Sequence, residues 1–134
     1  MTLDKLRTLF PNATTETWHC HTNGGGWVQN TAKVDATAYI GLDCIVIGNA
    51  RIYDNARIYD NARISGDAQV SGDAQVFGNA QVSGDVWIFG NARISGNARV
   101  TGNAWVSGNA RVTGDAWVYG PDLWRTHQPL KGNI

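Results

Sequence analysis

Aliphatic residues recur at every sixth position along most of this chain. Val or Ile occupies sixteen such positions in succession, without an insertion, at 28, 34, 40, 46, 52, 58, 64, 70, 76, 82, 88, 94, 100, 106, 112 and 118. All of them are β-branched, which favours extended backbone over helix. An amphipathic helix would place apolar residues three and four apart, so this spacing predicts a repeat of short strands over residues 28–123.

The other positions of each hexad complete the pattern when Val or Ile is counted as position one. Position five is Ala in 13 of the 16 hexads, position three is Gly in 11, and position four is Asn or Asp in 13. Side chains alternate between the two faces of a strand, so Ala and the aliphatic residue two positions later both point inward. Gly followed by Asn or Asp is typical of a turn. One hexad therefore predicts a short strand and a corner.

These hexads, with the consensus [Val/Ile]-x-Gly-[Asn/Asp]-Ala-x, resemble the repeats of the left-handed parallel β-helix superfamily. The resemblance implies an all-β fold of about five triangular coils, three hexads to a coil, and it alone implies the left hand. The recurring GNARV and GDAQV wording is most similar to short phage and prophage hexapeptide-repeat proteins. The segment HTNGGGWVQNTAKVDATAYIG, residues 21–41, is similar to the one those proteins place before their first coil.

The ends of the chain differ from the repeats. Thr2 is a candidate N-cap, the apolar residues at 3, 6, 9 and 10 share one helical face, and Pro11 ends the pattern. We expect this short helix to cover the exposed edge of the first coil, since open strand edges invite aggregation. The predicted organisation is a helix and capping segment at 1–27, the β-helix at 28–123, and a C-terminal cap or tail at 124–134.

Charge and composition exclude several classes of function. Eleven Lys and Arg balance eleven Asp and Glu, so no basic field favours nucleic acid. No apolar run is long enough for a signal peptide or a membrane span, so we expect a cytoplasmic protein with no membrane partner, in the host cytoplasm if a phage encodes it. Cys20 and Cys44 are too few to indicate a disulfide framework.

The sequence contains few residues that could serve in catalysis. Acyltransferases of the superfamily use a histidine on a loop between coils, and its zinc enzymes use three, but no histidine lies between His21 and His127. We therefore expect no metal and no cofactor. The alternative is an acyl-CoA-dependent acyltransferase in which His19 or His21 is the general base, and this rests on the resemblance alone.

Stepping through the repeats by three hexads sorts the outward residues onto three unequal faces. One face gathers Trp87, Phe89, Trp105 and Leu123, and we predict that it is buried in a homotrimer of parallel prisms. A second candidate interface gathers Arg57, Tyr59, Phe77, Arg93 and Arg111. The sequence thus predicts a non-enzymatic binding or assembly protein of phage type. Its partner is a phage component or a host defence protein, which could also occupy the tryptophan face.

Overall fold

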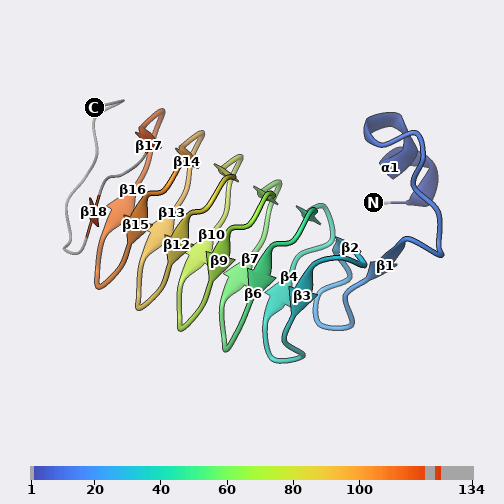
Figure 1. The fold of residues 1–134 in the computed structure, drawn as a ribbon, viewed down its shortest axis with the longest axis horizontal. Helices are drawn as coiled ribbons and strands as arrows, with labels where there is room; N and C mark the ends of the chain where they lie inside the picture. The colour runs from blue at the N-terminus through green and yellow to red at the C-terminus, as the bar shows by residue number, and fades with distance from the viewer. Residues whose placement is uncertain (1, 120–122, 125–134) are drawn as a thin grey trace.

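The chain winds into a parallel β-solenoid with three sheets, one on each side of the coil (Figure 1). The computed structural model describes residues 2–119 and 123–124, and at 119, 123 and 124 it describes the backbone only. Each turn of the solenoid contributes one short strand to each sheet. The predicted fold class, an all-β solenoid of about five coils with one short N-terminal helix, is confirmed.

The strands fall into three sheets in strict rotation. Sheet A contains β1 (Trp18–Cys20), β2 (Trp27–Gln29), β5 (Ile45–Val46), β8 (Arg63–Ile64), β11 (Gln81–Val82), β14 (Arg99–Thr101) and β17 (Trp117–Tyr119). Sheet B contains β3 (Lys33–Val34), β6 (Arg51–Ile52), β9 (Gln69–Val70), β12 (Trp87–Ile88), β15 (Trp105–Val106) and β18 (Leu123–Trp124). Sheet C contains β4 (Tyr39–Ile40), β7 (Arg57–Ile58), β10 (Gln75–Val76), β13 (Arg93–Ile94) and β16 (Arg111–Val112).

Register follows the repeat. Strands pair with the strand three hexads away, so that Trp87 lies opposite Trp105 and Arg93 lies opposite Arg111. All of these pairs are parallel; the antiparallel pair is β1 with β2. We number the coils from β2, so that coil one holds β2, β3 and β4, coil two holds β5, β6 and β7, and so on.

The hexad frame is confirmed by burial. From Ala38 to Val118, every Val or Ile at position one and every residue at position five is at most 1% exposed. Cys44 and Val86 replace Ala in two hexads and are also fully buried. A corner lined mostly by methyl groups leaves little space, so the interior is a narrow, fully packed apolar prism.

Corner geometry explains the glycine at position three. The glycines at this position from 48 to 114 have φ between 62° and 77°, the left-handed region that glycine tolerates. Asp54 and Asp60 replace glycine in two hexads and adopt φ of 60° as well. The Asn or Asp at position four does not share this conformation, because Asp54 and Asp60, both at position three, are the non-glycine residues with positive φ in the described part of the chain.

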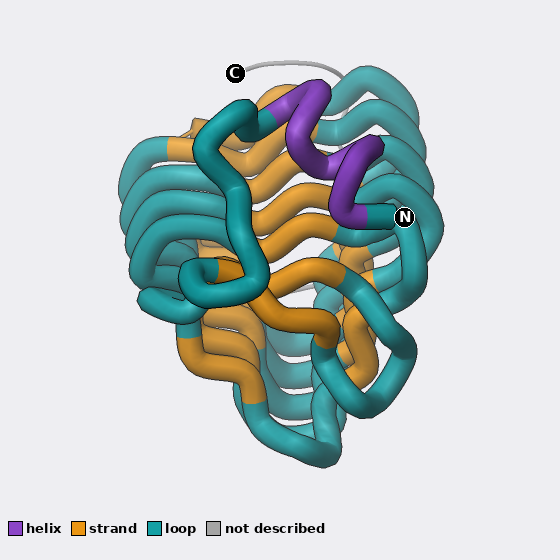
Figure 2. Tube along the Cα trace, turned by 90° about the vertical axis from the view of Figure 1, so that its right-hand side faces the viewer, coloured by secondary structure: helices purple, strands orange, loops and turns teal. Residues whose placement is uncertain are grey.

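The helix α1 (Leu3–Leu9) forms where predicted, and the Thr2 hydroxyl accepts a hydrogen bond from the backbone N–H of Lys5 at 3.2 Å. Its predicted position is wrong. Leu6 packs with Trp18 against Trp27 and Ile45, so α1 lies on the outer face of sheet A rather than over the edge of the first coil (Figures 1 and 2). Leu9, expected on the apolar face, is 42% exposed.

Other segments cover the edges of the first coil. β1 pairs with β2 at the edge of sheet A. At sheet C, the Gly26 N–H donates to the Ile40 carbonyl at 2.9 Å, and the Ile40 N–H donates to the Asn23 carbonyl at 2.9 Å. A Cβ at Gly24 would collide with the Ile40 carbonyl oxygen, so the glycine run permits this close approach. No described helix is long and apolar enough to cross a membrane.

Candidate binding faces

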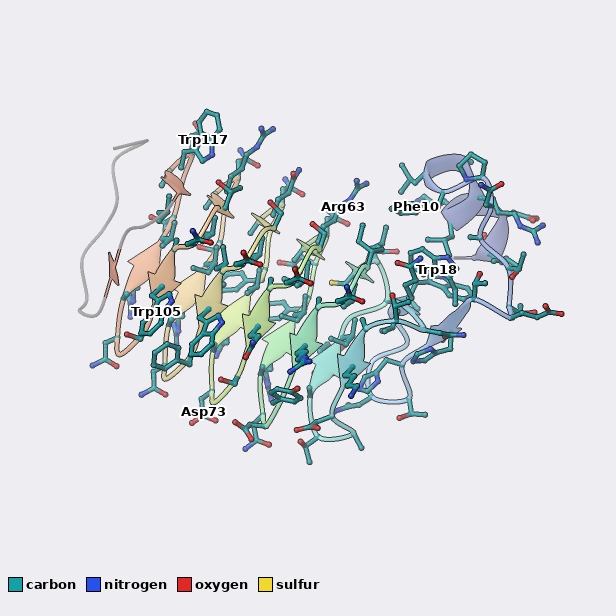
Figure 3. The ribbon with its side chains drawn as sticks, in the orientation of Figure 1. Phe10, Trp18, Arg63, Asp73, Trp105 and Trp117 are labelled. Atoms are coloured by element: carbon teal, nitrogen blue, oxygen red, sulfur yellow. The ribbon has the colours of Figure 1, made fainter. Side chains whose placement is uncertain are left out.

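The exposed apolar surface of sheet B is a pair of stacked tryptophans. The rings of Trp87 and Trp105 are 5.0 Å apart between centroids with an interplanar angle of 3°, and they remain 41% and 43% exposed. Phe89 packs edge-on to Trp105 at 6.3 Å. The cause is the register, which places residues 18 apart in adjacent strands. The predicted interface residues Trp87, Phe89 and Trp105 are thus brought together; Trp105 is labelled in Figure 3.

Leu123 belongs to the same column, since β15 pairs with β18 and Trp105 lies opposite Leu123. Its side chain lies outside the described residues, as does the predicted C-terminal segment from 125 onward. We therefore define the aromatic strip by Trp87, Phe89 and Trp105.

A hollow adjoins the aromatic strip on the side away from Trp105. Its volume is about 250 Å³, and it is lined by Gln69, Ser71, Trp87, Ile88 and Phe89. It forms because coil three carries Gln69 and Ser71 where coil four carries Trp87 and Phe89, so the surface drops by the height of an aromatic ring. The sheet B face is therefore stepped rather than flat.

Sheet C presents a second aromatic pair and a row of arginines. Tyr59 and Phe77 stack with centroids 4.8 Å apart and an interplanar angle of 1°, and the Tyr59 hydroxyl donates to the Gln75 side-chain oxygen at 3.1 Å. Desolvation raises the pKa of the Tyr59 hydroxyl above its usual value of 10.0. The second candidate interface is thus also contiguous, along β7, β10, β13 and β16.

The arginines of sheet C lie in one column with Gln75. Arg57, Arg93 and Arg111 are all exposed, and Arg93 and Arg111 are direct neighbours in adjacent strands. Like charges directly opposite in a sheet are destabilising.

The two N-terminal histidines lie in different environments. His19 is exposed, and its Nδ1 is 2.6 Å from the Asn30 side-chain oxygen. The Asn30 amide nitrogen donates to the Glu16 carbonyl at 2.8 Å, so Asn30 presents its oxygen to His19 and Nδ1 carries the proton. His21 is buried, and its Nε2 donates to the Ala38 carbonyl at 2.8 Å.

The two cysteines also lie in different environments. Cys20 is exposed, whereas Cys44 is fully buried in the core, where desolvation raises its pKa to about 12. Within the described residues, no three His, Cys, Asp or Glu side chains are grouped so that they could hold a metal ion.

The sequence pattern did not reveal a ladder of side-chain hydrogen bonds along one corner of the solenoid. The Asn61 side-chain amide donates to Asn79, Asn79 donates to Asn97, and Asn97 donates to Asp115, at 3.2 to 3.3 Å. Position four is Asn or Asp in most hexads, and this was the signal available for the ladder. These bonds tie coil to coil on the solvent side, and we assign them a structural role.

The comparisons with known proteins agree with this architecture. A family model described as the YdcK beta-solenoid repeat matches residues 50–66, 56–72, 68–84, 92–108 and 104–120, each match spanning nearly one coil. The chain is a β-solenoid repeat protein. No curated protein and no solved structure matches it. The left hand and the likeness to phage proteins remain predictions.

Proposed function

We propose that this β-solenoid protein is a non-enzymatic binding or assembly protein that acts through the outer faces of its coils. The observation that carries the proposal is the exposed, stacked pair of Trp87 and Trp105 on sheet B. An exposed aromatic strip of this kind usually marks a contact site. Each tryptophan that a partner covers contributes a large apolar area to the contact.

The partner takes one of two forms in this proposal. The first is self-association into a homotrimer of parallel prisms. The second is a phage component or a host defence protein, met in the host cytoplasm, for which the support is the likeness of the GNARV wording to phage repeat proteins.

A paired experiment tests the proposal. The wild type and Trp87→Ser/Trp105→Ser are compared for mass by light scattering and for proteins retained from a bacterial lysate. Trp117→Ser is the matched control, because Trp117 is 45% exposed but lies on sheet A. We expect the double variant, and not the control, to lose either mass or retained proteins. Identical results for all three proteins would remove the aromatic strip as a contact surface.

The alternative is an acyl-CoA-dependent acyltransferase. The Nε2 atom of exposed His19 is its best candidate base, because Nδ1 is bonded to Asn30 and the Nε2 of His21 donates to a carbonyl. Calorimetric titration with acetyl-CoA separates the two functions, and we expect no heat of binding. Micromolar binding, with transferase activity that disappears in His19→Ala/His21→Ala while circular dichroism stays unchanged, would favour the enzyme.

A further inference from the structure

Sheets B and C each present two outward columns of side chains, from positions six and two of the hexads. On sheet B these columns are Lys33, Arg51, Gln69, Trp87, Trp105 and Asp35, Tyr53, Ser71, Phe89, Ser107. On sheet C they are Tyr39, Arg57, Gln75, Arg93, Arg111 and Gly41, Tyr59, Phe77, Ser95, Thr113. The size and charge of the outward side chains can therefore be compared between the two faces, coil by coil.

The winding of the coils decides which columns meet when two copies lie side by side with parallel axes. Both chains turn in the same sense, so on two facing sheets the strands run in opposite directions. Position six of one sheet then faces position two of the other. In a ring, symmetry keeps all copies at one height, so strands of the same coil face each other, offset by a third of the coil spacing of about 4.8 Å.

Sheet B facing sheet C of a second copy matches large side chains with small ones. At coil three, the hollow beside Gln69 faces Phe77 of the second copy. At coil four, Trp87 faces Ser95, and at coil five Trp105 faces Thr113. On sheet B the side chains become smaller from coil four to coil three, whereas on sheet C they become larger, from Ser95 to Phe77. The two surfaces are therefore complementary in shape at this step.

Arginines of each face also meet aromatic rings of the other. Phe89 faces Arg93 of the second copy at coil four, and a guanidinium over an aromatic ring is favourable. The same pairing occurs twice at coil two. There Arg51 faces Tyr59 and Tyr53 faces Arg57. No two like charges are opposed among these pairs, so the arginines that repel one another within sheet C each gain a neutral or aromatic neighbour.

Other arrangements cover the aromatic strip less well. Sheet B against sheet B would place Trp87 against Phe89 at coil four and leave Gln69 opposite Ser71 at coil three, so the hollow would stay empty. Sheet A is obstructed at coils one and two, since α1 lies on its outer face over Trp27 and Ile45 (Figure 2).

We propose that the sheet B face of one copy packs on the sheet C face of a second, parallel copy, with Phe77 filling the hollow at Gln69 and Arg93 covering Phe89. This inference rests on the proposed role of the aromatic strip as a contact surface, and it joins both candidate interfaces in one contact. Because the two surfaces differ, the contact is heterologous and repeats around a ring. Two sides of a three-sided coil meet at an acute angle, so flat contact between them closes a ring of more copies than the homotrimer considered above.

Complementation between two variants tests this arrangement. Trp87→Ser/Trp105→Ser disables sheet B, and Arg93→Glu/Arg111→Glu disables sheet C. The matched control is Arg63→Glu/Arg99→Glu, the same change at the same hexad position on sheet A. Each protein is measured alone by light scattering, and the two interface variants are then mixed in equal amounts. Circular dichroism confirms that each variant is folded.

We expect the wild type and the control to be assemblies of several 14.5 kDa chains, and each interface variant alone to be a single chain. The mixture should form pairs with twice the mass of one chain and nothing larger, because each pair joins one intact sheet B to one intact sheet C. A monomeric wild type, a mixture that stays monomeric, or an Arg93→Glu/Arg111→Glu variant of wild-type mass would overturn the arrangement. If Arg93→Glu/Arg111→Glu keeps the wild-type mass and only Trp87→Ser/Trp105→Ser dissociates, the aromatic strip would still be supported as a contact surface.

Discussion

Replacing a corner glycine by alanine tests whether stacking of the coils, and not only the turn, requires glycine. Gly96 has φ of 67°, and a Cβ there would lie 2.8 Å from the backbone nitrogen and 2.9 Å from the carbonyl oxygen of Gly114, one coil further on. Gly114 has nearly the same φ, 64°, but a Cβ there would meet no described atom within 4 Å. The two glycines share a conformation and differ in their neighbours.

The structure sets the expected magnitudes. In both variants alanine in the left-handed region costs about 1 to 2 kcal/mol. Loss of freedom in the unfolded chain offsets about 0.4 to 1 kcal/mol of this. Gly114→Ala should therefore lose about 1 kcal/mol of unfolding free energy. In Gly96→Ala the methyl group also collides with the backbone of Gly114, whose carbonyl accepts a hydrogen bond from the Asn97 N–H at 2.8 Å, and overpacking adds about 1 to 3 kcal/mol.

Thermal unfolding followed by circular dichroism measures the difference. For a domain of this size, each kcal/mol lowers Tm by about 4 °C, so Gly96→Ala should melt at least that far below Gly114→Ala. If the two variants melted together, the close approach of Gly96 to Gly114 would have no energetic consequence, and the glycine columns would be required by the turns alone.

Three further predictions concern the core residues and the cysteines. Ala98→Leu should overpack a corner and lower the free energy of unfolding by about 1 to 3 kcal/mol or more. Val100→Ala should leave a void and lower it by about 2 kcal/mol. Both are measured by denaturant unfolding, and unchanged midpoints would show that the hexad frame is wrong. Cys20 should react with a thiol reagent at pH 8 while Cys44 stays protected until the fold opens. The pKa of Cys44 rises from 9.0 to about 12 on folding, so its contribution to stability is complete below pH 9 and is lost as the pH rises towards 12. When the free energy of unfolding is measured over this pH range, it should decrease in the wild type and decrease less in Cys44→Ala.

The repeat frame and the core follow from the sequence because each hexad contains the residues that form one strand and one corner. A β-branched residue, a small inward residue and a corner glycine specify one side of the prism, and regular spacing brings residues such as Trp87 and Trp105 together. The resemblance supplied the number of sides. The contiguity of the two candidate interfaces could therefore be predicted from the spacing of their residues together with the three hexads per coil that the resemblance implies.

Tertiary contacts decide the features that depend on more than one repeat. The face covered by α1 depends on the apolar surface formed by Trp27 and Ile45, and a helical apolar stripe does not specify which surface it meets. The hollow beside Trp87 depends on side-chain heights in neighbouring coils. The different environments of His19 and His21 depend on their hydrogen bonds, to the Asn30 side chain and to the Ala38 carbonyl respectively. Each of these contacts joins segments that no single hexad encodes, so only the folded chain brings them together.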